Sequence, residues 1–260
     1  MPQFERYIGI DYSGAETPIS SLKALQVYTA DWLTQPKVIP PPPGLRKHWT
    51  RKGIAEWLAS QLSTPKPTLV GIDHAFSFPF RYFERHRLPT DWPKFLEDFQ
   101  KHWPTDDDHT YVCFVRDGSR GQGAKRQGDA SWMRLTELWT AAAKSVFQFD
   151  VQGQVANSTH AGLPWLRFIR QQCGNRVHFW PFDGWEIPGG SSAVVEIYPS
   201  LWMKRFHVEN RNAHQQAAYA AAAWLRRMDM SDSLGQFLNP PLEPHERTLA
   251  KVEGWILGVT

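Results

Sequence analysis

The chain has 260 residues, of which 42% are hydrophobic and 21% are charged, so it falls within the range of globular proteins with a large buried core. This composition excludes an intrinsically disordered chain, a collagen-like chain and a small disulfide-stabilised protein. Lys and Arg total 29 against 26 Asp and Glu, giving a formal net charge of +3. A phosphate-binding protein of this composition has to concentrate its positive charge locally.

Short apolar runs alternate with amphipathic segments along the chain, which predicts an α/β fold. In chain order, the pattern predicts strands at 4–11 and 20–30, a stiff proline-rich connector at 40–44, a helix at 52–62, a strand at 68–73, a helix at 92–103, a strand at 110–115, a loop at 116–129, helices at 130–146 and 162–173, strands at 177–182 and 192–199, and helices at 211–230 and 244–257. No internal repeat or low-complexity linker divides the chain, so we expect a single domain spanning 1–260.

The cysteine content and the N-terminal segment predict a reduced, cytoplasmic protein. Two cysteines, Cys113 and Cys173, are too few for a disulfide framework or a zinc site. The N-terminal residues lack the charged, apolar and small-residue regions of a secretory signal. The most apolar run, 217–225, is less than half of the ~20 residues that a membrane span needs, so we expect no membrane association. Nothing in the sequence indicates an oligomeric state.

Three predicted strands carry an acidic residue at or near their ends: Asp11, Asp73 and Glu196. The carboxyl ends of neighbouring strands in α/β sheets converge on a common crevice. Carboxylates brought together there repel one another, and a cation such as Mg²⁺ or Mn²⁺ would neutralise them. A pair of such ions supports phosphodiester hydrolysis. Each acid taken singly has a simpler interpretation, which is a turn aspartate or glutamate after a strand.

The segments around these acids resemble a large domain-of-unknown-function family whose members are predicted nucleases of the ribonuclease-H-like fold. The likeness lies in residues 9–15 (GIDYSGA), 71–76 (GIDHAF), 143–149 (AKSVFQF), 158–165 (STHAGLPW), 196–199 (EIYP) and 252–258 (VEGWILG), and so spans nearly the whole chain. It implies a ribonuclease-H-like mixed sheet flanked by helices, with helical and loop insertions, and a Mg²⁺- or Mn²⁺-dependent nuclease activity.

The resemblance also implies roles for individual residues. Acids from the first, fourth and a later strand hold the metal in that fold, and these positions match Asp11, Asp73 and Glu196. The family places a fourth carboxylate in the late alanine-rich helix, where this chain has Ala217. His214 lies three residues earlier on the same helix face and is a candidate replacement, although an ordinary exposed or capping histidine is the alternative. Without a replacement, the protein would be a non-catalytic nucleic-acid-binding protein of the same fold.

Two further regions are candidates for binding nucleic acid. Residues 116–128 (RDGSRGQGAKRQG) combine four basic residues with four glycines, so Arg120, Lys125 and Arg126 are predicted to contact phosphates, unless this is a solvated flexible loop. Lys144 and His160 lie in the family-like segments and are predicted substrate contacts. His160 is a candidate general acid near neutral pH, with a structural histidine as the alternative.

Other classes of protein have weaker support. Tryptophan is abundant, with 13 residues spread along the chain, and this favours an aromatic-rich core over base stacking. An actin-like phosphotransferase would normally need a second domain of the same kind. The sequence lacks the Gly-x-Ser-x-Gly elbow of a serine hydrolase, and Cys113 is expected to be buried within a strand. A metal-dependent nuclease is therefore the leading prediction.

Overall fold

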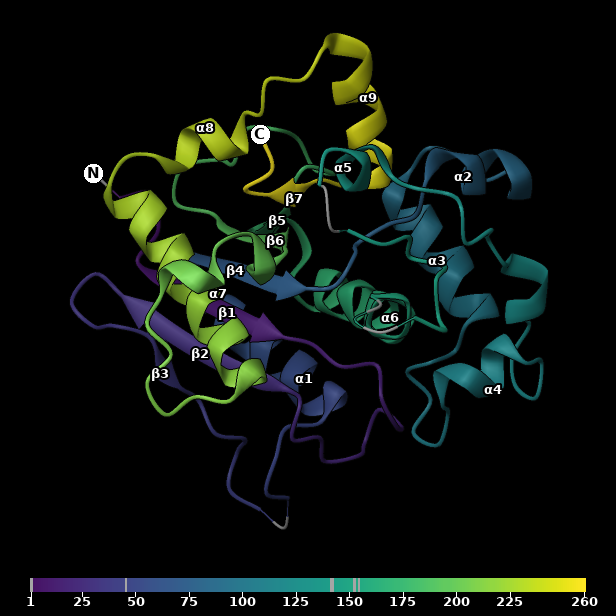
Figure 1. The fold of residues 1–260 in the computed structure, drawn as a ribbon, viewed down its shortest axis with the longest axis horizontal. Coiled ribbons are helices and arrows are strands. Elements are labelled where there is room, and N and C mark those ends of the chain that lie inside the picture. The colour runs from purple at the N-terminus through teal and green to yellow at the C-terminus, as the bar shows by residue number, and fades with distance from the viewer. Residues whose placement is uncertain (1, 45, 141–142, 152, 154) are drawn as a thin grey trace.

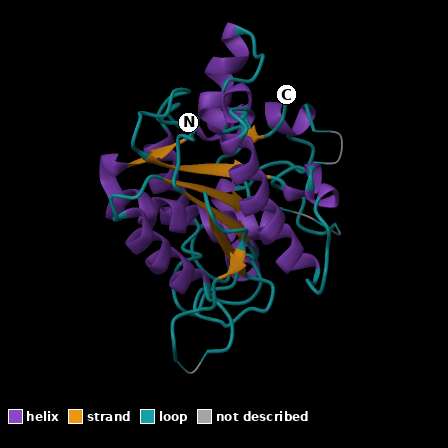
Figure 2. Ribbon diagram, turned by 90° about the vertical axis from the view of Figure 1, so that its left-hand side faces the viewer, coloured by secondary structure: helices purple, strands orange, loops and turns teal. Residues whose placement is uncertain are grey.

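The computed structural model describes residues 2–44, 46–140, 143–151, 153 and 155–260 (Figure 1). Within these ranges seven strands form one mixed sheet with helices on both faces, an α/β architecture (Figure 2). The strands are β1 (Arg6–Asp11), β2 (Gln26–Asp31), β3 (Lys37–Val38), β4 (Thr68–Asp73), β5 (Val177–Phe179), β6 (Ser192–Ile197) and β7 (Ile256–Leu257). The α-helices are α1 (Arg51–Leu62), α2 (Phe80–His86), α3 (Trp92–His102), α4 (Val112–Arg116), α5 (Leu135–Leu138), α6 (Ala156–Cys173), α7 (Ala213–Met230), α8 (Leu234–Leu238) and α9 (Pro244–Glu253).

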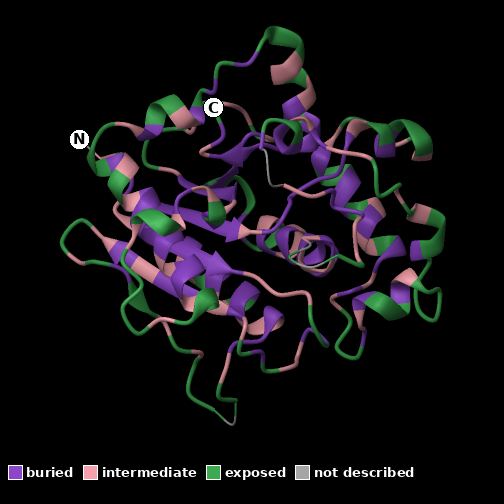
Figure 3. Ribbon diagram, viewed as in Figure 1, coloured by how far each residue is buried: buried purple, intermediate pink, exposed green. Residues whose placement is uncertain are grey.

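The sheet joins an antiparallel part to a parallel part. Its order is β3-β2-β1-β4-β6-β5, and β7 pairs with the second half of β6. Strand β2 pairs antiparallel with both β1 and β3, whereas β1, β4, β6, β5 and β7 run parallel. The register places Asp11 beside Asp73, and Ile72 beside Glu196. The central strands are buried along nearly their whole length (Figure 3).

Helix α7 lies very close to one face of the sheet because small residues meet at the contact. A Cβ atom added to Gly9 would lie 2.3 Å from the carbonyl oxygen of Ala218 and 2.5 Å from the amide nitrogen of Ala222. The helix begins with a capping box, in which the side chains of Asn212 and Gln215 each accept from the other residue's backbone N–H. This cap fixes the first turn of α7, which lies at the carboxyl end of β1.

The opposite face of the sheet packs against α1, α3 and α6 through a large aromatic core. Helix α6 contains Pro164, which has no N–H to donate to the carbonyl of His160 four residues earlier. The hydroxyl of Thr105 donates to that carbonyl at 2.5 Å instead, so the proline leaves no unsatisfied acceptor. None of the described helices combines the length and apolar character that crossing a membrane requires.

The predicted α/β class with a mixed sheet is confirmed, the predicted strands 20–30 and 177–182 are shorter in the structure, and the largest errors concern residues 110–115 and 130–146. Residues 110–115 were predicted as a strand, but α4 occupies most of this segment, so Cys113 is exposed and not within a strand. The predicted helix 130–146 was wrong for most of its described length, where only α5 is an α-helix. Neither segment contributes a strand to the sheet, so the strand propensity of residues 110–115 had no neighbouring strand to pair with. The predicted helix 244–257 ends at Glu253, because Gly254 adopts φ +81° and the chain turns into β7.

Candidate functional site

A pocket of about 390 Å³ opens at the carboxyl ends of β1, β4 and β6. Five of the residues that the sequence predicted for the site line it: Asp11, Asp73, Lys144, Glu196 and His214. They come from three strands, the start of α7 and the segment after α5. The topology thus brings together residues that are far apart in the sequence, as expected where parallel strands end side by side.

Asp11 and Asp73 form a pair of like charges in this pocket. Their Cα atoms are register partners on adjacent parallel strands, which lie roughly 4.7–4.9 Å apart, so both side chains leave the same face of the sheet. Burial raises the pKa of the Asp11 carboxyl, and a hydrogen bond from His214 opposes this rise. Burial and then the charges of Asp11 and Glu196 raise the pKa of Asp73 well above its usual range. A bound proton or cation would relieve the repulsion between the two carboxylates.

His214 is held against Asp11 by the first turn of α7. Its Nδ1 lies 2.8 Å from Oδ2 of Asp11, and its side chain is 55% exposed. The hydrogen bond to Asp11 raises the pKa of the imidazole. Ala217, one turn further along α7, is buried and does not line the pocket. That His214 replaces the carboxylate expected at position 217 stays a prediction. The histidine lies at the site, but there it contacts Asp11, which is itself a predicted ligand.

Glu196 lines the same pocket as the two aspartates, but its carboxylate is ion-paired with Arg134. Because it is the register partner of Ile72, its side chain leaves the face of the sheet opposite to that of Asp73. There the guanidinium of Arg134 donates to both carboxylate oxygens, at 2.6 and 2.7 Å. No group of three or more His, Cys, Asp or Glu side chains that could hold a metal ion occurs in the described part of the chain. The predicted three-carboxylate arrangement is thus reduced to an open pair, Asp11 and Asp73.

His160 lies in the interior and not in the pocket, contrary to its predicted contact with substrate. It is 1% exposed and is surrounded by aromatic rings, with ring centroids 4.4 Å away at Trp103 and 4.8 Å away at Phe149. Its Nδ1 lies 2.9 Å from the carbonyl oxygen of Ala156. Burial lowers the pKa of this histidine to about 3, so it is neutral at physiological pH. These contacts give His160 a structural role.

The three basic residues predicted from the glycine-rich segment do not line the pocket. Arg126 makes a two-pronged ion pair with Asp98, at 2.7 and 2.9 Å. Arg120 and Lys125 are exposed, each with one neutral side-chain hydrogen bond at 3.3 Å. A contact between this segment and phosphate stays a prediction for Arg120 and Lys125, while the charge of Arg126 is already balanced within the protein.

Two residues of the pocket escaped the sequence analysis. Arg134 belongs to a segment predicted as the interior of a helix, and only its i, i+3 spacing to Glu137 hinted at a pair. His74 directly follows Asp73, and its Nδ1 lies 2.8 Å from the carbonyl oxygen of Ala75. Burial lowers the pKa of His74 to about 4, so it is uncharged at neutral pH. A Cβ atom on Gly162 would lie 2.4 Å from Nε2 of this ring, so a glycine is required beneath it.

The pocket therefore combines acceptors for a cation with donors for an anion. Asp11 and Asp73 supply carboxylate oxygens, Lys144 places positive charge in the same pocket wall, and Arg134 adds a guanidinium that is paired with Glu137 and Glu196. Comparisons of the chain with protein-family models, curated proteins and solved structures give no match.

Proposed function

We propose that this protein is a metal-dependent phosphodiesterase that hydrolyses nucleic acid, with Asp11 and Asp73 as the carboxylate ligands of a Mg²⁺ or Mn²⁺ ion. The observation that carries this proposal is the side-by-side placement of two aspartates at the ends of parallel strands, in a pocket that also holds cationic side chains. A divalent cation relieves the repulsion between them, and substrate phosphate oxygens complete its coordination.

The topology supports the finer fold assignment. An antiparallel hairpin that contains β1 is joined to the parallel strands β4 and β6. The acids lie on the first strand, on the fourth and on a later strand, which is the distribution that the ribonuclease-H-like resemblance implies. We therefore include a ribonuclease-H-like fold in the proposal.

The donor set fits one cation between the two aspartates. Oδ2 of Asp11 accepts from His214, while Oδ1 of Asp11 and both carboxylate oxygens of Asp73 have no hydrogen-bond donor among the described residues. Oxygens of this kind, in a pocket and repelled by each other, are suited to a hard cation. When bound, such an ion lowers the pKa of a water molecule and stabilises charge on a leaving oxygen.

The remaining side chains act on substrate and on the aspartates. His214 fixes the orientation of the Asp11 carboxylate through its Nδ1. Lys144 places positive charge in the wall of the pocket, where it attracts an anionic phosphodiester. Arg134, whose charge is already shared with Glu137 and Glu196, contributes fixed N–H donors that orient it. The buried ring of His74 lines the pocket next to Asp73.

Calorimetric titration of Mn²⁺ in phosphate-free buffer tests the proposal, together with cleavage assays on single- and double-stranded DNA and RNA. The wild-type chain should bind the ion and cleave at least one of these substrates, and Asp73→Asn should abolish both. Asp107→Asn, which changes an exposed aspartate outside the pocket, is the matched control and should leave both unchanged. Equal ion binding by wild type and Asp73→Asn would contradict the proposal.

One observation favours a second candidate, a nucleic-acid-binding protein without catalytic activity. Arg134 holds both oxygens of Glu196, and Ala217 supplies no ligand, so two of the four carboxylates that the resemblance implies are missing from the open site. Binding of an oligonucleotide with a steep dependence on salt, but no cleavage at saturating Mn²⁺, would select this candidate.

A further inference from the structure

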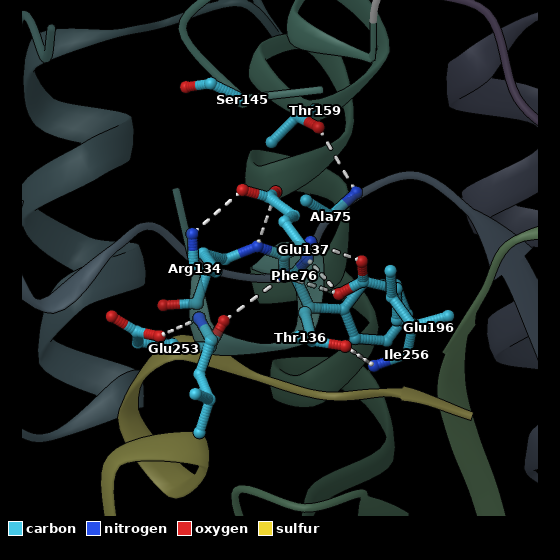
Figure 4. Close-up of polar contacts among 12 residues, drawn as sticks. Ala75, Phe76, Arg134, Thr136, Glu137, Ser145, Thr159, Glu196, Glu253 and Ile256 are labelled. Carbon is cyan, nitrogen blue, oxygen red and sulfur yellow. Dashed lines mark hydrogen bonds and ion pairs between the residues drawn. The ribbon is translucent and has the colours of Figure 1, made fainter. Parts of the chain in front are cut away.

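Arg134 is a buried arginine in the wall of the pocket (Figure 4). Its Nη1 and Nη2 donate to Oε2 and Oε1 of Glu196 at 2.7 and 2.6 Å, a fork-to-fork pair between residues 62 positions apart in the sequence. Its Nε donates to Oε1 of Glu137 at 2.9 Å. The guanidinium is therefore fixed between two carboxylates and not free to swing away.

The backbone around this arginine is fixed as well. Nη1 also donates to the carbonyl oxygen of Glu253 at 3.2 Å. The Glu253 carboxylate in turn accepts from the backbone N–H groups of Phe80 and Leu135, at 2.5 and 2.6 Å. Glu137 of α5, Glu253 of α9 and Glu196 of β6 thus meet at one guanidinium, as Figure 4 shows. Burial lowers the pKa of Arg134, but its two carboxylate partners more than offset this and raise the pKa above its usual value, so the guanidinium stays charged.

Glu196 has donors on both oxygens, unlike the two aspartates. Besides the two bonds from Arg134, its Oε2 accepts from the N–H of Phe76 at 3.2 Å. A metal ion placed on Glu196 would have to displace the guanidinium or lie beside a fixed positive charge. Neither condition applies at Asp73, whose carboxylate has no donor in the described part of the chain.

We infer that Arg134 takes the place of a second metal ion, so that the site holds one divalent cation and one guanidinium. The inference rests on the proposed function, and it assigns Arg134 to the substrate phosphate. Arg134 lines the same pocket as Asp11 and Asp73, and its Nη2 makes a single hydrogen bond within the described residues. A phosphoryl oxygen is the acceptor that a guanidinium binds well in such a position.

Counting bound ions tests this inference on the full chain. We would titrate the protein with Mn²⁺ in phosphate-free buffer, with and without a short oligonucleotide, and follow the free ion by electron paramagnetic resonance alongside calorimetry. The expected result is one ion per chain, lost in Asp73→Asn. Two ions per chain would overturn the inference and leave the proposed function standing. No bound ion, even with the oligonucleotide, would overturn the proposed function itself.

Glu196→Gln gives a second readout that does not depend on activity. If Glu196 is a partner of Arg134 and not a ligand, this variant keeps one bound ion with wild-type affinity. Loss of the ion in Glu196→Gln, with a wild-type circular dichroism spectrum, would make Glu196 a ligand and refute the inference. If the variant does not fold, the count of ions on the wild-type chain decides the question.

Discussion

Two groups of charges line the same pocket, and the fold treats them in opposite ways. Asp11 and Asp73 are acidic residues on adjacent strands, and within the described residues His214 is the only side chain that hydrogen-bonds to either carboxylate. Arg134 and Glu196, by contrast, neutralise each other through two short hydrogen bonds. The first group leaves repulsion that a ligand can relieve. The second is complete without one, so it stabilises the fold in the absence of any ligand.

The largest effect is expected from breaking the compensated group. Arg134→Met leaves Glu137 and Glu196 buried without their cation, and removing one partner of a buried pair costs about 3–5 kcal/mol. Urea denaturation of wild type and variant measures this loss in the free energy of unfolding. The matched control is Arg120→Met at an exposed arginine, expected to change stability by no more than about 0.5 kcal/mol. Similar small losses in both variants would show that the cluster contributes little.

His160, in the aromatic core, is a third kind of buried titratable group, because burial keeps its imidazole uncharged. Burial lowers the pKa of His160 to about 3 in the folded chain, whereas the unfolded chain binds a proton near pH 6.5. Stability from this group is therefore complete above about pH 6.5, and it is lost as pH falls towards 3, by up to about 1.4 kcal/mol per pH unit.

Denaturation of wild type and His160→Phe between pH 7 and pH 4 measures this dependence. The variant should lose the part of the slope that belongs to His160, while His245→Gln, at an exposed histidine, should keep the wild-type slope. Parallel slopes for wild type and His160→Phe would show that His160 is accessible to protons in the folded protein.

Removing a charge from the Asp11–Asp73 pair should raise the free energy of unfolding, whereas removing Arg134 should lower it. Asp73→Asn removes a charge that burial and neighbouring acids disfavour, so at pH 7 and low salt we expect stabilisation by about 1 kcal/mol. Differential scanning calorimetry measures this as a higher melting temperature, with Asp107→Asn as the control. A clear loss of stability would instead make Asp73 a structural residue.

The smallest effect concerns binding of nucleic acid. Lys144→Met removes one positive charge from the pocket and should reduce the slope of log K against log salt by about 0.9 for double-stranded DNA. Lys251→Met removes a charge of the same kind from an exposed position outside both the pocket and residues 116–129, and it should leave the slope unchanged. An equal reduction in both variants would show that Lys144 has no particular role in binding.

The sequence predicted the positions of Asp11 and Asp73, but it did not predict the pairing of Arg134 with Glu196. Asp11 and Asp73 each follow a short apolar run, so local pattern alone placed them at strand ends. Whether Glu196 faces the same side as Asp73 depends on the register between β4 and β6, and a shift of one residue reverses every side chain. Single-sequence reasoning has no access to that register. Arg134 was missed for a related reason, since its partner lies 62 residues away.

The boundaries of the elements were predictable to the extent that the sheet enforces them. Strand β4 and helix α1 follow clear apolar patterns and match their predicted ranges closely. Helix α4 lies in an insertion, where β-branched and aromatic residues favoured a strand that has no neighbour to pair with. Helix α6 begins six residues before the predicted start, and Pro164 is tolerated because Thr105 supplies the missing donor.

The close approach of α7 to Gly9 couples the chemistry of the pocket to a residue with no side chain. Asp11 lies two positions beyond Gly9 on β1, and His214 lies in the first turn of the helix that Gly9 touches. A methyl group at Gly9 would clash with the backbone of α7 and push the helix away from the sheet, and His214 would move away from Asp11. The hydrogen bond between His214 and Asp11 thus depends on the distance between the sheet and α7. A substitution at Gly9 could break it without changing any polar residue of the pocket.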